Sequence, residues 1–168
     1  MPHLSVIGYL TNPNNPNNAI ELDAAQTAAR SLGKDLLPLM ASNDGEIDAA
    51  FANMAQQRGG ALLSASDALF FLWRQKIASL AVRYRIPAIY YLREYAQTGG
   101  LMSYGNSLTD AYHLVGVYVG RILKGEKPAD LPVVQSTKYE LVINLKTAKE
   151  LRLAIPPGIM SIADEVIE

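Results

Sequence analysis

Cysteine is absent from the 168 residues of this chain, and histidine occurs only twice. Without cysteine the chain can form no disulfide, zinc–thiolate site or thiol nucleophile. The two histidines, His3 near the chain start and His113 in a predicted helix, have no partner at metal-ligand spacing. Phosphate-binding loops, dinucleotide-binding glycine motifs and the serine-nucleophile motif are missing as well. The sequence therefore predicts no enzyme activity, no metal and no cofactor.

An excess of one charge sign is also absent. Lys and Arg number 15 and Asp and Glu 16, so the formal net charge is −1. Such a chain does not attract a phosphate backbone, and nucleic acid is not expected as its main partner. No apolar run approaches the roughly 20 residues that span a bilayer, and the first ten residues lack the basic and apolar regions of a signal peptide. We expect a soluble chain, cytoplasmic if it is a complete gene product.

Short apolar runs alternate with amphipathic segments in the first 100 residues. The predicted strands cover residues 4–10, 36–40, 61–64 and 88–92, each closed by turn residues. The predicted helices cover residues 19–32, a segment that carries Ile47, Ala50, Phe51 and Met54 on one face, and residues 69–84. This alternation predicts an α/β fold, a parallel sheet with helices on both faces.

The second half of the chain has a different rhythm. Residues 101–104 are predicted to be extended, residues 107–123 a long helix, residues 133–135 and 139–144 two more strands, and residues 146–151 a short helix. The long helix is apolar over a wide arc, formed by Leu108, Ala111, Tyr112, Leu114, Val115, Val117, Tyr118, Val119 and Ile122.

The loop after the first predicted strand is rich in asparagine and proline, and it includes Asn12, Asn14 and Asn15. Backbone amides at the start of the next helix, aided by these side chains, could hold a carboxylate or another polar ligand group. Alternatively, the asparagines cap the helix and the prolines set its start.

Polar and aromatic side chains also follow the third and fourth predicted strands. Ser66 and Asp67 lie at the carboxyl end of one, where open α/β sheets bind ligands, or else Asp67 caps the next helix. Arg93 follows the other, where it could pair with Glu94, contact ligand or lie in water. The nearby tyrosines could form pocket walls, although strand alternation must place some of them in the core; they are Tyr90, Tyr91, Tyr95 and Tyr104.

Three stretches together carry a family resemblance. They are Asn-Pro-Asn-Asn-Pro-Asn at 12–17, Gly-Gly-Leu-Met-Ser-Tyr-Gly at 99–105 with Leu-Thr-Asp-Ala-Tyr at 108–112, and the segment 120–132, which continues through 138–148. In these stretches the chain resembles the ABC-transporter solute-binding proteins of the tryptophan/tyrosine type, which have the type I periplasmic-binding fold. The resemblance covers essentially the whole chain.

The resemblance implies two α/β lobes joined by a hinge, with a small solute such as an aromatic amino acid in the cleft and a membrane permease as partner. Residues 1–100 would form the second lobe, residues 101–128 a hinge-crossing strand and helix of the first lobe, and residues 129–168 the return segment and tail. The implied cleft contacts are Asn12, Asn14, Asn15, Ser66, Asp67, Tyr91, Arg93, Ser103 and Tyr104. The implied location is the periplasm or cell envelope.

The sequence also departs from the family. The first lobe and export signal of the family would precede Met1, and Ala68-Leu69-Phe70-Phe71 stands where a more polar stretch is expected. A truncated homologue that acts as an oligomeric or interaction protein is therefore an alternative, and an enzyme on a flavodoxin-like sheet is a third. Without its partner sheet, helix 107–123 would expose its stripe, so we expect a homodimer through this helix; otherwise the helix folds back onto its own sheet.

Overall fold

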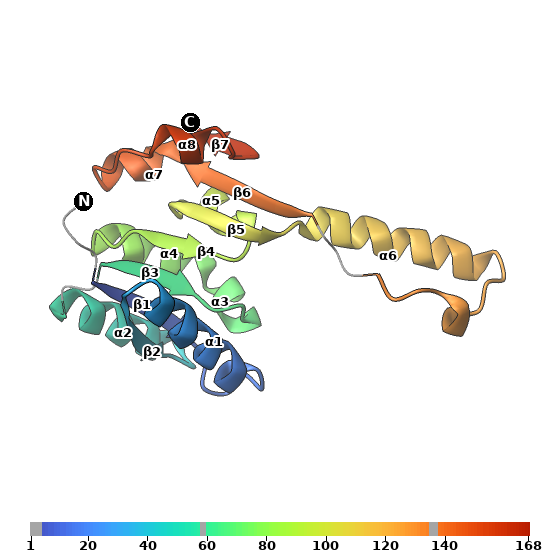
Figure 1. Cartoon of the computed structure of the whole chain (residues 1–168), viewed down its shortest axis with the longest axis horizontal. Coiled ribbons are helices and arrows are strands. Elements are labelled where there is room, and N and C mark those ends of the chain that lie inside the picture. Colours follow the sequence, from blue (N-terminus) through green and yellow to red (C-terminus); the bar gives the residue numbers. More distant parts are fainter. Residues whose placement is uncertain (1–4, 58–59, 135–137) are drawn as a thin grey trace.

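The computed structural model describes residues 5–57, 60–134 and 138–168, which form a seven-stranded sheet in the order β2-β1-β3-β4-β5-β6-β7 (Figure 1). The strands are β1 (Val6–Thr11), β2 (Asp35–Met40), β3 (Ala61–Ser64), β4 (Ala88–Tyr90), β5 (Met102–Asn106), β6 (Tyr139–Asn144) and β7 (Glu165–Ile167). Neighbouring strands are parallel except β5 and β6. The predicted α/β class and the parallel pairing of the first four strands are confirmed.

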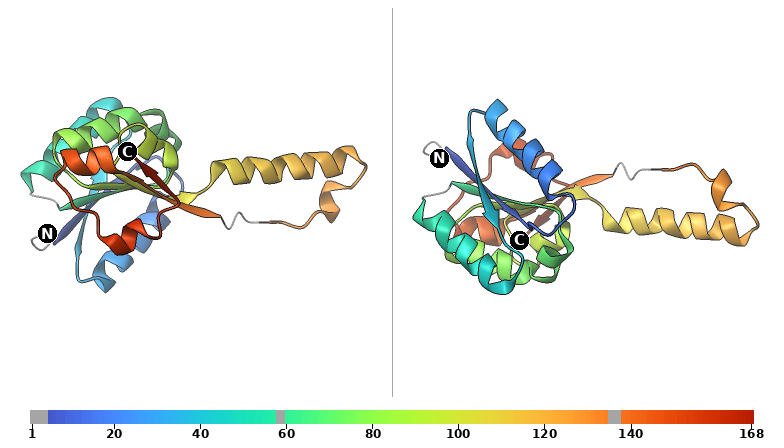
Figure 2. Two further views of the ribbon diagram at one scale, coloured as in Figure 1. Left: turned by 90° about the horizontal axis from the view of Figure 1, so that it is seen from above. Right: turned by 90° about the horizontal axis from the view of Figure 1, so that it is seen from below.

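The helices are distributed unequally over the two faces of the sheet. They are α1 (Asn18–Ser31), α2 (Asp44–Gln56), α3 (Ala68–Leu72), α4 (Arg74–Arg83), α5 (Arg93–Gln97), α6 (Leu108–Leu123), α7 (Leu145–Glu150) and α8 (Pro157–Met160). Figure 2 shows α1 and α8 on one side of the sheet and α2 and α4 on the other. This distribution follows from right-handed crossovers. The chain steps toward one edge of the sheet from β1 to β2 and toward the other edge from β2 to β5, so the connecting helices lie on opposite faces.

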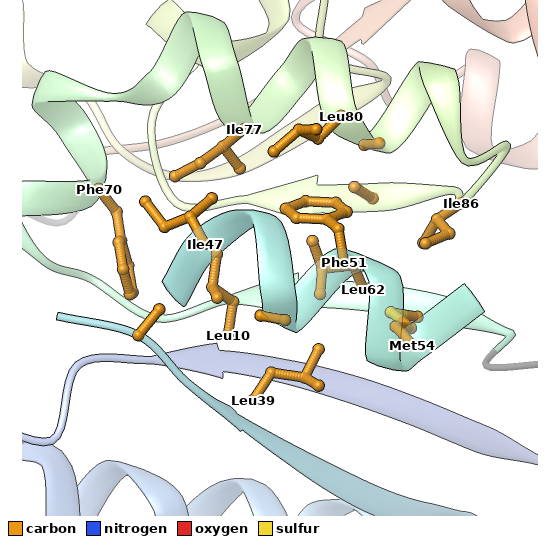
Figure 3. Close-up of a cluster of buried hydrophobic side chains, with 14 of the residues drawn as sticks. Leu10, Leu39, Ile47, Phe51, Met54, Leu62, Phe70, Ile77, Leu80 and Ile86 are labelled. Atoms are coloured by element: carbon orange, nitrogen blue, oxygen red, sulfur yellow. The ribbon is translucent and has the colours of Figure 1, made fainter. Parts of the chain in front are cut away.

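The main core lies between the sheet and the α2–α4 layer (Figure 3). Ile47, Phe51 and Ile77 come from the helices and are at most 1% exposed. They pack with Leu10 and Leu62 of the central strands. In this layer the apolar face of each helix packs against the apolar face of the strands, and the resulting core supports the loops at the strand ends.

Residues 69–84 form two helices rather than the single predicted helix. The break is at Trp73, where α3 ends and α4 begins. At this junction the guanidinium of Arg74 lies over the Phe71 ring, 4.6 Å from its centroid, and donates a hydrogen bond to the Phe71 carbonyl over 2.9 Å. A local side-chain contact of this kind has no periodic signal in the sequence.

Other boundaries differ at the ends of elements and in the second half. The predicted strand 88–92 ends at Tyr90 because α5 begins at Arg93. Val133 and Val134 are not in a strand, since no neighbouring strand lies beside them, and residue 135 of that predicted strand is outside the described residues, as is residue 4 of the first. The sequence did not indicate α5, α8 or the edge strand β7, which are five, four and three residues long.

Helix α6 projects away from the sheet and does not fold back onto it (Figure 1). None of its side chains, all of which the structure describes, is buried. The return segment lies along the helix, with the Tyr118 hydroxyl donating to the Pro132 carbonyl over 2.6 Å. We call residues 107–134 the arm. No helix within the described part of the chain is long and apolar enough to cross a membrane.

The boundary expected at residue 101 is not where the structure divides the chain. Met102–Asn106 is β5, which pairs with β4 on one side and β6 on the other, so it belongs to this sheet. The extended geometry predicted for residues 101–104 is found from Met102 onward, and these residues pair within this sheet. Only the arm leaves it.

Gly105 should not tolerate a side chain. A Cβ at this position would overlap the backbone carbonyl of Tyr91, so Gly105→Ala must push the ends of β4 and β5 apart. We expect a loss of about 1–3 kcal/mol of unfolding free energy, measured by urea denaturation. Gly116→Ala is the control, because open space surrounds Gly116 on α6 and alanine favours a helix; a similar loss in both variants would contradict the assigned contact.

Candidate functional site

Three loops meet at the carboxyl edge of the sheet. The asparagine-rich loop follows β1, Ser66 and Asp67 follow β3, and Tyr91 follows β4. Because β1, β3 and β4 are consecutive neighbours in the sheet, their carboxyl ends bring these loops together. In open α/β sheets this edge is where ligands bind.

The Asp67 carboxylate joins the first two loops. Its Oδ2 accepts hydrogen bonds from the side-chain amides of Asn15 over 2.7 Å and Asn12 over 3.3 Å. Its Oδ1 accepts the backbone amide of Leu69 over 2.8 Å, so Asp67 also caps α3. The helix-cap interpretation is thus correct, and the same side chain still lies at the predicted site.

The asparagine loop is shaped by its own side chains. The Oδ1 atoms of Asn12 and Asn15 accept the backbone amides of Asn14 and Asn17 over 3.0 and 2.9 Å. Both side-chain amide groups are therefore fixed with their nitrogens toward Asp67, and each nitrogen has a second N–H. Asn17 is the residue before α1, and its side chain makes no capping bond.

The Asp67 carboxylate is almost completely buried, with 8% of the residue exposed. No ion pair among the described residues includes it, since its neighbours are amide donors. A buried carboxylate is normally paired with a cation. Asp67 therefore gives this edge of the sheet an uncompensated negative charge, which is suited to a positively charged group.

Tyr91 completes the junction from β4. Its hydroxyl donates to the backbone carbonyl of Asp67 over 2.8 Å. Burial is the main cause that raises the pKa of this hydroxyl, and the charges of Asp67 and Glu94 add to it. The phenol therefore stays protonated at neutral pH and fixes the position of the Asp67 backbone.

The other tyrosines near this edge have different roles. Tyr90 and Tyr95 are buried and stacked with ring centroids 4.5 Å apart, so they belong to the core, as strand alternation required for some of the four. Tyr104 is 56% exposed and stacks on Tyr139 of β6 at 5.7 Å, at the base of the arm. Tyr91 and Tyr104 are the two that reach the edge.

Arg93 and Ser103 do not join the Asp67 cluster. Arg93 forms ion pairs with Glu140 of β6 and Glu165 of β7, rather than with Glu94, and links α5 to the last two strands. Ser103 is 1% exposed, on the helix-covered face beside Tyr90. The structure thus brings together Asn12, Asn15, Ser66, Asp67 and Tyr91, leaves Asn14 exposed on the rim, and places the other predicted contacts elsewhere.

Sequence reasoning missed Tyr139, Glu140 and Glu165. Residues 139–144 were predicted to be a strand, but the antiparallel pairing with β5 places the start of β6 at the carboxyl edge. A sequence pattern does not specify that pairing.

No group of three acidic or histidine side chains within residues 5–57, 60–134 and 138–168 could hold a metal ion.

Solved structures with the same fold are nearly twice as long as this chain. A conserved domain protein from Vibrio cholerae O1 biovar El Tor superposes with a TM-score of 0.86 at 22% identity, over 99% of this chain and 56% of that one. An ABC domain in complex with L-Trp from Streptococcus pneumonia gives 0.83 at 24% identity, over 97% and 56%. A ligand-free, open substrate binding protein with adhesive properties from Clostridium difficile gives 0.72 at 20% identity, over 99% and 55%.

A comparison with curated proteins found no match. The sequence model of one family, described as ABC transporter substrate binding protein, matches residues 1–167, which is nearly the whole chain. The match agrees with the open α/β sheet. The chain belongs to the ABC transporter substrate binding protein family.

Proposed function

We propose that this chain forms one wall of a solute-binding site and binds an amino acid, with aromatic amino acids as the first candidates, without chemical conversion. The observation that carries the proposal is the buried Asp67 carboxylate, which is held by Asn12 and Asn15 and has no cationic partner among the described residues. An amino acid ammonium group would supply the missing positive charge.

The surroundings of Asp67 fit the rest of such a ligand. The remaining N–H groups of Asn12 and Asn15 can donate to a carboxylate, and Ser66 adds a hydroxyl. Tyr91 at the junction and the Tyr104–Tyr139 stack at the arm base offer aromatic surface. The similar Streptococcus pneumonia protein, whose structure contains L-Trp, supports an aromatic amino acid as the first ligand to test.

A second wall is needed to enclose the ligand. The chain spans just over half the length of the similar structures, and its arm extends beyond the carboxyl edge (Figure 1). We infer that residues 5–106 and 138–168 form one lobe and that the arm belongs to the body opposite. A permease partner and a location in the cell envelope follow from the family as part of this proposal.

The alternative is a homologue that has lost transport and acts as an oligomeric or interaction protein. The exposed apolar stripe of α6 favours it, since contiguous apolar surface marks an interface. Ligand binding separates the two functions, because only the first requires an intact Asp67 junction.

L-tryptophan, L-tyrosine and L-phenylalanine should each be titrated calorimetrically into the 168-residue chain and its Asp67→Asn variant. We expect at least one of them to bind the parent and to lose at least tenfold in affinity in the variant, because the ammonium group loses its counter-charge. A ligand at 100 times its dissociation constant would add about 2.7 kcal/mol to the unfolding free energy. Asp23→Asn, an exposed carboxylate on α1, is the matched control. Unchanged affinity in Asp67→Asn would refute the ligand assignment, and no binding to the parent would favour the alternative.

The choice of asparagine at position 67 follows from the double role of the carboxylate. Asp67→Ala removes the α3 cap and leaves the amides of Asn12 and Asn15 unpaired, so we expect a loss of about 1–3 kcal/mol of stability. Asp67→Asn keeps a capping oxygen and should lose less. Thermal unfolding of both variants checks this order, and an Asp67→Ala protein as stable as the parent would contradict the hydrogen bonds described.

A further inference from the structure

The arm leaves the sheet between two neighbouring strand ends. Asn106 at the end of β5 pairs with Tyr139 at the start of β6. One position farther out, the backbone amide of Ser107 donates to the Lys138 carbonyl over 3.0 Å. None of the side chains of α6 is buried, so the sheet does not support the helix along its length. The direction of the arm therefore depends on how these two strand ends are held.

Arg93 holds these strand ends on one face of the sheet. The register pairs Gly105 with Glu140, so the Glu140 side chain lies on the face that α5 covers. The Arg93 guanidinium donates to the Glu140 carboxylate over 3.2 Å and also pairs with Glu165 of β7. Only 11% of the Glu140 side chain is exposed, whereas Lys138, 3.7 Å from its other oxygen, is 61% exposed. Arg93 is therefore the cation on which the Glu140 carboxylate mainly depends.

An aromatic pair holds the same strand ends on the opposite face. Tyr104 precedes Gly105 and Tyr139 precedes Glu140, so both tyrosine side chains point away from the α5 side. Their rings stack with centroids 5.7 Å apart. The base of the arm is thus held by charge on one face and by aromatic contact on the other. We call Arg93, Glu140, Tyr104 and Tyr139 the clamp.

The segment that carries Arg93 also carries Tyr91 of the Asp67 junction. The Tyr91 hydroxyl donates to the Asp67 carbonyl over 2.8 Å. The Tyr91 backbone carbonyl lies directly against Gly105, where it leaves no room for a Cβ. Residues 91–93 therefore contact the Asp67 junction, the end of β5 and the start of β6. An unbroken row of contacts connects the junction to the base of the arm, as a mechanical link between two sites requires.

We propose that Arg93 is a positioning residue, which fixes the direction of the arm relative to the Asp67 junction. It acts through Glu140, so that β5 and β6 leave the sheet as one stiff ribbon. Hinges are a few residues at the ends of elements, and the clamp places this point beyond the strand ends, at Ser107. The inference rests on the proposed function in one respect, that the arm belongs to the body opposite the junction. Arg93 then orients that body without touching the ligand.

The absence of cysteine allows the direction of the arm to be measured with two nitroxide labels. Gln75→Cys on α4 and Lys124→Cys at the end of α6 are exposed positions that report the distance from the lobe to the tip of the arm. Pulsed dipolar electron spin resonance should give one narrow distance distribution for the otherwise unchanged chain. Arg93→Gln should make it about twofold broader, because Glu140 loses its counter-charge and the strand ends can separate.

Two controls separate the clamp from a general loss of charge. Glu165→Gln removes the other ion pair of Arg93, but β7 does not border the arm. Arg83→Gln removes an exposed arginine of α4 that forms no ion pair within the described part of the chain. Both should keep the narrow distribution. Glu140→Gln should broaden it as Arg93→Gln does, and the double variant should be no broader than either, because all three lose the same contact.

A distribution that stays narrow in Arg93→Gln, or one that is already broad in the labelled parent, would overturn the proposal. Equal broadening in Glu165→Gln or Arg83→Gln would overturn it as well. A second label pair within the lobe, at the exposed positions 23 and 75, shows whether each variant is folded, and Glu140→Gln decides if Arg93→Gln is not.

These measurements contain no ligand, so they are independent of the amino acid titrations. A chain whose arm loosens in Arg93→Gln but which binds no amino acid overturns only the ligand proposal. A chain that binds an amino acid and keeps its arm in place in Arg93→Gln overturns only the role of Arg93.

Discussion

The Asp67 carboxylate holds together the loops at the carboxyl edge of the sheet, where we propose that a ligand binds. It joins the asparagine loop after β1 to the start of α3 after β3, while Tyr91 from β4 fixes the Asp67 backbone. Three neighbouring strands thus share one junction, and its charge is balanced by no cation among the described residues. Amide donors keep a carboxylate in place without neutralising it, so the contacts that stabilise the loops also leave the negative charge to which the proposed ligand would bind.

Chain topology explains the rest of the surface. Since one crossover goes to one face and the later ones to the other, the α2–α4 side holds a large core with Phe51 and Ile77, and the α1 side keeps a groove beside Met102. Helix α6 has an apolar face, and no strand among the described residues packs against it. In the proposed function, the arm belongs to a second body that faces the carboxyl edge.

The sequence predicted the first half of the fold well because its signals are local. Alternating strands and helices, the turn signals of the asparagine loop and the glycines that end helices specify β1 to β4 and the edge at which Asp67 lies. The second half depended on pairing between distant segments. The sequence predicted a strand at residues 139–144, but nothing in these residues indicated that it lies antiparallel beside β5. Without that pairing, the ion pairs of Arg93 with Glu140 and Glu165 could not be predicted either.

By itself the sequence determined the fold class, the family motifs and a set of polar residues at strand ends, because hydrophobic periodicity and turn chemistry are written in neighbouring residues. Only the tertiary structure decided which of those residues meet. It grouped Asp67 with Asn12 and Asn15, buried Ser103, assigned Arg93 to an ion pair and turned α6 away from the sheet. Contacts between residues about 50 positions apart, such as Asn15 with Asp67, depend on strand order and crossover direction, and these are properties of the whole packed chain rather than of any segment of it.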